Sequence, residues 1–234
     1  MKGREWYQAT DVAEEYEEKR FSRGGRLIDQ RERRAVLDAL APLEEATILE
    51  IAAGTGRFTV ELADRGADVT ALDISAPMLH QGRTKAHAVG IDDDIAFLRG
   101  DAARLPFPDD HFDAVFAMRF FHLAATPVRF LSEMARVSRH QVFFDTFNRG
   151  SLRSVYNWLL PMGSRLYSAS QVNGLLAEVG LTLAGSEHDF VFPYGLYRTI
   201  PDSIATPLRG LDEAIVGNRV GELFATVSFW DARV

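Results

Sequence analysis

The chain has 234 residues, a formal net charge of −7 and no cysteine. Without cysteine there are no disulfides, thiolate metal ligands or cysteine nucleophiles, and the acidic balance disfavours a nucleic-acid partner because phosphate binding requires a basic face. No apolar run approaches the roughly 18 residues of a membrane span, and the N-terminus lacks the apolar core of a signal peptide. We therefore expect a cytoplasmic α/β protein with a full hydrophobic core.

The predicted elements begin with two helices, over residues 4–20 and 26–40. From residue 47 onward, strands and helices alternate, a pattern that predicts a parallel sheet with right-handed crossovers. The predicted strands of this part are residues 47–52, 68–72, 95–98, 113–118 and 141–146, and the predicted helices are residues 57–65, 76–89 and 127–138.

The alternation changes after Thr146. We expect an aromatic-rich helix over residues 148–166 and a capped helix over residues 170–179 that ends at a glycine. A strand is predicted to begin at Leu181 and to extend to about Phe192. A final strand near residues 224–230 would complete the sheet.

A glycine turn follows the first predicted strand. Residues 48–56 read ILEIAAGTG, and the second predicted strand leads to Asp73. In a doubly wound sheet these two strand ends lie side by side, at the crevice where nucleotide-like ligands bind. Gly54 and Gly56 let the backbone approach a ligand closely, and the Asp73 carboxylate can accept hydrogen bonds from ribose hydroxyls. The pattern therefore indicates a site for a ligand that carries adenosine.

Two other nucleotide motifs fit this turn poorly. A dinucleotide fingerprint needs a third glycine, and that position holds Thr59. A phosphate-binding loop of the Walker type needs a Gly-Lys-Ser/Thr sequence after the glycines, which is absent. A nicotinamide-dependent oxidoreductase on the same sheet nevertheless stays open as an alternative.

The motifs resemble those of the class I S-adenosylmethionine-dependent methyltransferases. Residues 50–56, Glu-x-Ala-x-Gly-x-Gly, resemble motif I of this family, with Ala52 where the first glycine normally stands. Four further segments resemble the family's second-strand signature, its adenine-contacting segment, its fourth strand with the exit from it, and the helix before its fifth strand. These are residues 71–79, 97–109, 111–122 and 133–137. Together the motifs cover roughly residues 45–150 in the family's order, and they are most similar to the subgroup of ubiquinone and menaquinone biosynthesis methyltransferases.

The resemblance implies a Rossmann-like, doubly wound α/β fold. Its seven-stranded sheet would be mostly parallel with one antiparallel strand, and a helical N-terminal cap and substrate-side insertions would surround it. We expect one domain over residues 1–234, with the cap in residues 1–44, the cofactor-binding core in 45–150 and the acceptor-side segments in 151–234.

The implied cofactor is S-adenosylmethionine, which leaves as S-adenosylhomocysteine. The implied function is methyl transfer to a small, apolar or aromatic acceptor at oxygen, nitrogen or carbon, without a metal ion or a nucleic-acid partner. We expect a monomer or a homodimer. A non-catalytic protein that only binds S-adenosylmethionine is the remaining alternative.

Candidate site residues are transferred position by position from these motifs. The glycines would face the methionine half of the cofactor, Asp73 the ribose, and Asp101 with the next backbone N–H the adenine. The implied cofactor-binding residues are Glu50, Gly54, Thr55, Gly56, Asp73, Ile74, Asp101, Ala102 and Met118.

The acceptor side is predicted from residues around this core. His122 follows the fourth strand and is the candidate general base, although the interpretation as a structural histidine is slightly favoured over it. Asp145 is a second, weaker candidate. The candidate acceptor-binding residues are Tyr16, Arg119, Tyr156 and Tyr194. Their aromatic surroundings suit an apolar or ring-bearing molecule.

Overall fold

The computed structural model describes residue 18 and residues 20–159, 164–217 and 219–234. The helix predicted over residues 4–20, and Tyr16 within it, therefore lie outside the described residues except at positions 18 and 20. In the described part of the chain, no helix is long and apolar enough to cross a bilayer.

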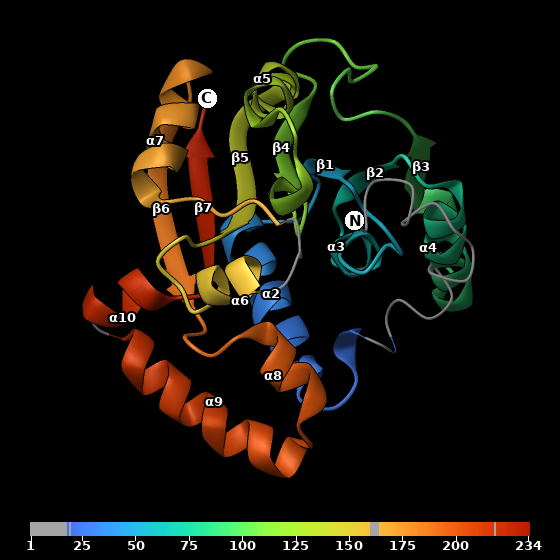
Figure 1. Ribbon diagram of the computed structural model, residues 1–234. Helices are drawn as coiled ribbons and strands as arrows, with labels where there is room; N and C mark the ends of the chain where they lie inside the picture. The colour runs from blue at the N-terminus through green and yellow to red at the C-terminus, as the bar shows by residue number, and fades with distance from the viewer. Residues whose placement is uncertain (1–17, 19, 160–163, 218) are drawn as a thin grey trace.

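A seven-stranded sheet runs through the molecule in the order β3-β2-β1-β4-β5-β7-β6 (Figure 1). The strands are β1 (Thr47–Ile51), β2 (Asp68–Asp73), β3 (Ile95–Arg99), β4 (Phe112–Ala117), β5 (Ser138–Phe147), β6 (Thr182–Asp189) and β7 (Val227–Arg233). The first five strands are mutually parallel, and β7 pairs antiparallel with both β5 and β6. The doubly wound sheet with one antiparallel strand is therefore confirmed, and this strand, β7, lies between β5 and β6.

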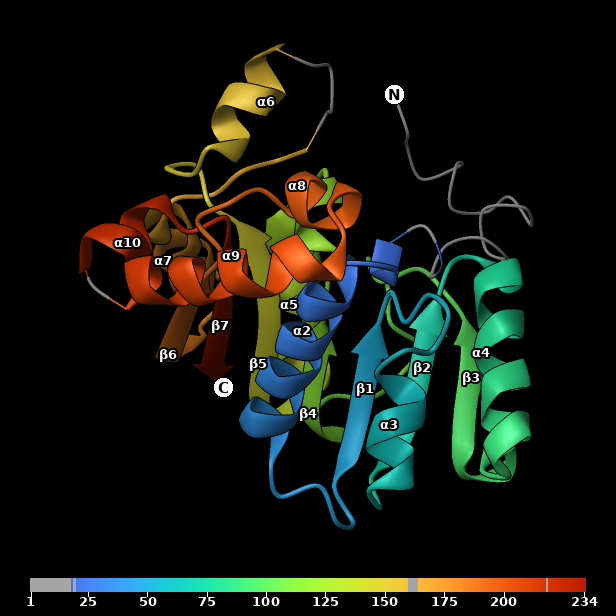
Figure 2. The ribbon, with the colours of Figure 1, turned by 90° about the horizontal axis from the view of Figure 1, so that it is seen from below.

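Helices cover both faces of the sheet (Figure 2). One face packs against α2 (Gly25–Leu40), α3 (Thr59–Asp64) and α4 (Ala76–Val89), and the other against α5 (Pro127–Val137) and α7 (Ala169–Glu178). Strand residues alternate between the two faces, so that Ile48 belongs to the core under α2 and Leu49 to the core under α5. Both faces are apolar because parallel strands are buried on both sides.

Local signals explain why several helices begin and end where they do. Ser75 caps α4 by accepting a hydrogen bond from Met78 N, and the helix ends at Gly90 with a φ of 77°. Ser168 and Gln171 form a capping box at the start of α7. These caps place α4 and α7 within a residue of the predicted positions.

The region after β5 differs from the prediction. The helix expected over residues 148–166 is present only as α6 (Arg153–Leu159), up to the edge of the described residues, and β6 ends at Asp189 rather than near Phe192. The pattern predicts no helix between β6 and β7, whereas α8 (Tyr194–Thr199), α9 (Asp202–Val216) and α10 (Arg219–Phe224) lie there. Helices α6 and α8 lie beyond the carboxyl ends of the parallel strands (Figure 2).

Candidate functional site

The turn after β1 is held in an unusual backbone conformation. Ala52, Gly54 and Gly56 have φ values of 56°, 57° and 70°, in the left-handed region that glycine adopts without strain. Ala52, where the family's first glycine normally stands, is therefore tolerated at a cost of about 1 kcal/mol. Among the described residues, a Cβ built on Gly54 meets no atom closer than Ala52 O at 3.9 Å, so they leave open space in front of this turn.

Asp73 connects the turn to the end of β2. Its Oδ2 accepts a hydrogen bond from Gly54 N and its Oδ1 one from Ser75 N, each at 2.8 Å. The carboxylate is 8% exposed, and burial raises its pKa against the opposing effect of these backbone donors. A carboxylate has about four acceptor positions, so two remain for hydroxyl donors of a ligand.

The next loop carries the predicted adenine contacts. Gly100 N donates to Asp73 O at 3.0 Å, which fixes the exit of β3 beside the end of β2. Asp101 is exposed and accepts a hydrogen bond from Ala103 N, whereas Ala102 is buried and Ile74 half-buried. The two carboxylates predicted for ribose and adenine therefore lie on adjoining loops at one edge of the sheet.

Glu50 faces inward rather than toward the open turn. It is 2% exposed, and Thr59 Oγ1 donates to its Oε2 at 2.5 Å. Burial raises the pKa of Glu50 to about 8. The position that a dinucleotide fingerprint would fill with glycine is thus occupied by a buried threonine that connects α3 to β1. Of the other turn residues, Thr55 is also buried, and its carbonyl oxygen accepts a hydrogen bond from Lys85 Nζ.

A buried ionic network begins beside the glycine turn. Arg57 donates to Asp29 Oδ1 at 2.5 Å and to Glu32 Oε2 at 2.8 Å, and Arg119 Nε donates to Glu32 Oε1 at 2.5 Å. Arg119 N, at a residue with a φ of 58°, donates to Asp145 Oδ1 at 2.5 Å. The network therefore joins α2, the glycine turn and the ends of β4 and β5.

The carboxylates of this network titrate differently. Burial acts to raise the pKa of Glu32, but the guanidinium groups of Arg119 and Arg57 outweigh it and hold that pKa below its usual value. Burial raises the pKa of Asp145 to about 7, against the attraction of Arg119 and with the support of the Glu32 charge. Asp145 is therefore the carboxylate that can exchange a proton near neutral pH.

His122 lies close to this network, in the short turn after β4. Its side chain is buried, and its ring centroid is 5.1 Å from that of Phe147. Burial, followed by the positive charges of Arg119 and Arg153, lowers its pKa well below the usual value. The imidazole is therefore neutral at pH 7, and its protonated form is disfavoured.

The remaining predicted residues differ in how they are placed. Tyr194 is fully buried, its ring is 4.6 Å from Arg119 Cζ, and its hydroxyl has no partner among the described residues. Met118 is buried in the core under α2. Tyr156 belongs to α6, but its side chain lies outside the described residues, as does Tyr16.

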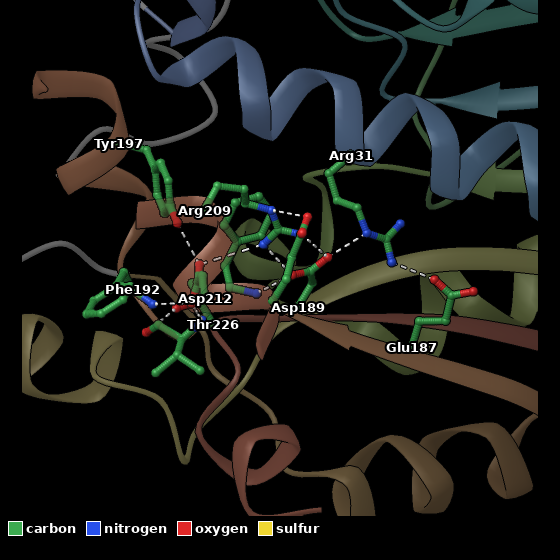
Figure 3. A network of polar contacts seen from close by, with 11 residues as sticks. Arg31, Glu187, Asp189, Phe192, Tyr197, Arg209, Asp212 and Thr226 are labelled. Atoms are coloured by element: carbon green, nitrogen blue, oxygen red, sulfur yellow. Dashed lines mark hydrogen bonds and ion pairs between the residues drawn. The ribbon is translucent and has the colours of Figure 1, made fainter. Parts of the chain in front are cut away.

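A second ionic network holds the segment that carries Tyr194 (Figure 3). Arg209 of α9 binds Asp189 through two hydrogen bonds of 2.6 and 2.8 Å, and Arg31 of α2 reaches the same carboxylate at 2.5 Å. Asp212 accepts a hydrogen bond from Tyr197 Oη at 2.8 Å and also binds backbone N–H groups after β6. These bonds fix α8 and α9 against α2 and β6, and thereby fix the position of Tyr194.

Sequence reasoning missed Glu32, although a signal was available. Glu32 lies on the same helical face as Ile28, Ala35 and Val36, all of which are buried. A carboxylate on an apolar face predicts a buried ionic partner. Among the described residues, no group of three or more His, Asp or Glu side chains is placed to hold a metal ion.

Comparison with known proteins gives consistent results. A family model described as a methyltransferase domain matches residues 49–144. A demethylmenaquinone methyltransferase of Thermus thermophilus is 40% identical over 183 residues, which cover 75% of this chain and 74% of that protein. One from Beutenbergia cavernae is 42% identical over 112 residues, but the match spans only 48% of this chain and 44% of that relative's length.

A solved structure agrees in fold. The crystal structure of magnesium protoporphyrin IX methyltransferase from Synechocystis, with bound S-adenosylhomocysteine, has a TM-score of 0.67 with this chain. The alignment covers 98% of this chain and 96% of the other, at 15% sequence identity. At this sequence identity, the likeness shows that the two proteins share a fold.

Proposed function

Because this chain belongs to the class I S-adenosylmethionine-dependent methyltransferases, in the subgroup related to ubiquinone and menaquinone biosynthesis, we propose that it transfers a methyl group from S-adenosylmethionine to a small acceptor. The observation that carries the proposal is the junction of the glycine turn with Asp73. The left-handed turn leaves open space at Gly54, and a carboxylate with spare acceptor positions lies 2.8 Å from the Gly54 N–H. A turn whose backbone a ligand can approach closely therefore lies beside a carboxylate that can accept hydrogen bonds from ribose hydroxyls.

We assign the cofactor-binding roles as follows. Asp73 would accept hydrogen bonds from the ribose hydroxyls. Asp101 and the Ala102 N–H would bind the adenine ring, and Gly54 and Gly56 would border the methionine half of the cofactor. Ile74 packs against adenine and Met118 against the methionine chain. Glu50 acts indirectly, since its bond to Thr59 supports the start of α3 behind the turn. The bound cofactor supplies an electrophilic methyl group.

The protein's part in the chemistry is to hold an acceptor in line and to exclude water. We propose that Tyr194 and Arg119 contact the acceptor, together with Tyr16 and Tyr156. Between the two candidates for accepting a proton, Asp145 is better poised than His122, because the pKa of Asp145 is raised to about 7 while nearby guanidinium groups disfavour a protonated His122.

The acceptor is proposed to be small and apolar or aromatic. Phe147, Tyr194 and Phe190 present closely packed rings next to the buried network, with centroid distances of 5.9 and 5.0 Å. The net charge of −7 disfavours a nucleic acid. We propose that the protein acts in the cytoplasm and that it is a monomer or a homodimer. Light scattering of the purified protein would determine the oligomeric state.

The proposed function is tested by assaying transfer of a labelled methyl group from S-adenosylmethionine to a panel of quinols and phenols. We expect transfer to at least one acceptor by the wild type, and none by Gly54→Val, whose side chain fills the open space. Transfer at the same rate by both proteins would contradict the placement of the cofactor. A folded wild type that binds no S-adenosylmethionine would contradict the function itself.

A further inference from the structure

Three guanidinium groups gather around two adjoining aromatic rings beyond the ends of β4 and β5. Arg153 Cζ lies 3.8 Å from the ring centroid of Phe147, and Arg119 Cζ lies 5.9 Å from it. Arg119 Cζ is also 4.6 Å, and Arg198 Cζ 5.9 Å, from the ring centroid of Tyr194. We call Arg119, Arg153 and Arg198 the arginine cluster. Its members come from the β4 exit, α6 and α8.

The described carboxylates near the arginine cluster do not pair with Arg153. Glu32 is shared between Arg119 and Arg57, and Asp145, with a pKa of about 7, carries about half a negative charge at neutral pH. Arg153 forms no ion pair with any described residue, and its side chain donates a hydrogen bond to Ser164 Oγ at 3.1 Å. A half-buried guanidinium thus lacks a carboxylate partner among the described residues, an arrangement that is costly in a folded protein.

Two buried donors in the same place have no acceptor. Arg153 Nε and Tyr194 Oη are buried and make no hydrogen bond with the described residues. Nearly all buried polar groups in proteins are paired, so these two donors are available to acceptor atoms from outside the described residues. Stacking on Phe147 accounts for the guanidinium plane of Arg153 but leaves its Nε–H unsatisfied.

The electrostatic environment of the neighbouring side chains is also positive. The pKa of His122 is lowered by burial and then by Arg119, Arg153, Arg20 and Arg198. The pKa of Arg153 is itself lowered to about 10, first by burial and then by Arg119. In a chain with a net charge of −7, a concentration of positive charge at this position is a specific local feature and does not follow from composition.

We propose that the arginine cluster, with Tyr194 Oη, binds an anionic oxygen group, a carboxylate or a phosphate, on the methyl acceptor. The inference rests on the proposed function, because Arg119 lies in the network that begins at the glycine turn. The acceptor then has an apolar or aromatic body against Phe147 and Tyr194 and an anionic group that pairs with Arg153. A guanidinium suits both oxyanions, since it donates in a planar fork.

The test compares Arg153→Met, Arg153→Lys and the control Arg34→Met, an exposed arginine of α2. Sodium benzoate and sodium pyrophosphate are titrated calorimetrically into each protein, with and without saturating S-adenosylhomocysteine, at constant ionic strength. We expect wild type and Arg34→Met to bind one of the anions, benzoate indicating a carboxylate and pyrophosphate a phosphate. Arg153→Met should bind it at least tenfold more weakly, and Arg153→Lys should recover part of the affinity.

Folding and cofactor binding serve as separate readouts. The thermal midpoint of Arg153→Met without ligand should equal or exceed that of wild type, because an unpaired buried charge has been removed. Equal anion affinity in wild type and Arg153→Met, or no anion binding by wild type, overturns the proposal. A tenfold loss of S-adenosylhomocysteine affinity in Arg153→Met also overturns it, because the cluster would then hold the cofactor's own carboxylate. Failure of wild type to bind S-adenosylhomocysteine, with anion binding intact, contradicts the proposed function alone.

Discussion

Glu50 and Asp145 should make the protein less stable as the pH rises from 6.5 to 8. Burial raises their pKa values to about 8 and about 7, from ordinary values of 4.5 and 3.8. In this range the unfolded chain has already lost both protons, whereas the folded protein begins with both bound and releases them as the pH rises. The stability that these protons provide is full below the unfolded-state pKa values and is lost as the pH rises through the folded-state values.

The size of the effect follows from the same values. One pKa unit corresponds to about 1.4 kcal/mol. Between pH 6.5 and 8, linkage gives a combined loss of about 2 kcal/mol, of which Glu50 contributes roughly two thirds. For a chain of this size that is a fall in thermal midpoint of about 4–8 °C. Below pH 6.5 the lowered pKa values of His122 and His188 act in the opposite direction, because the unfolded chain then binds more protons.

The assay is thermal and urea unfolding at half-unit pH steps from 5.5 to 8.5, with wild type and Glu50→Gln. Glutamine retains an acceptor for Thr59 Oγ1 and cannot ionise, so this variant should lose more than half of the dependence on pH between 6.5 and 8. It should also be more stable than wild type at pH 8. Two outcomes would contradict the role of these buried carboxyl groups. One is a pH dependence of stability in Glu50→Gln equal to that of wild type, and the other is a wild type whose stability rises between pH 6.5 and 8.

Four further substitutions have definite expected outcomes. Ala52→Gly should raise the free energy of unfolding by up to about 1 kcal/mol in urea titrations, because left-handed strain is relieved; a loss of stability would contradict it. Asp145→Asn should lower kcat by about 10²–10⁴-fold and remove the kinetic pKa near 7, whereas His122→Ala should keep most of its activity; the reverse pattern would make His122 the base. Asp189→Ala should cost about 3 kcal/mol, since Arg209 and Arg31 both lose their bonds to this carboxylate while Arg209 keeps Asp212 and Glu213; an unfolding midpoint equal to that of wild type would exclude this role.

Elements with local signals were predictable from the sequence. The capping Ser75 and the left-handed Gly90 define α4 at the predicted residues, and the apolar runs of β1 to β4 coincide with the predicted strands within one or two positions. The family motifs place the glycine turn beside Asp73, as the hydrogen bond from Gly54 N confirms.

The rest depends on contacts between distant residues. Tyr167 N donates to Phe147 O and Arg149 N to Tyr167 O, so that Tyr167 lies beside the end of β5. Neither bond has a local signal in the sequence. Helix α9 contains Pro207 in its interior, which weakens any helical pattern in the sequence. The arginine cluster joins residues from distant parts of the chain, and only the tertiary fold brings them together.

The most direct test of the central claim is calorimetric titration of wild type and Asp73→Ala with S-adenosylhomocysteine, with NADH and NADPH as controls. We expect wild type to bind S-adenosylhomocysteine with micromolar affinity and to bind neither NADH nor NADPH. In Asp73→Ala the binding should be weaker by about 1–3 kcal/mol, because two charge-assisted hydrogen bonds to the ribose are lost. Binding of only a nicotinamide cofactor, or equal S-adenosylhomocysteine affinity in the two proteins, would contradict it.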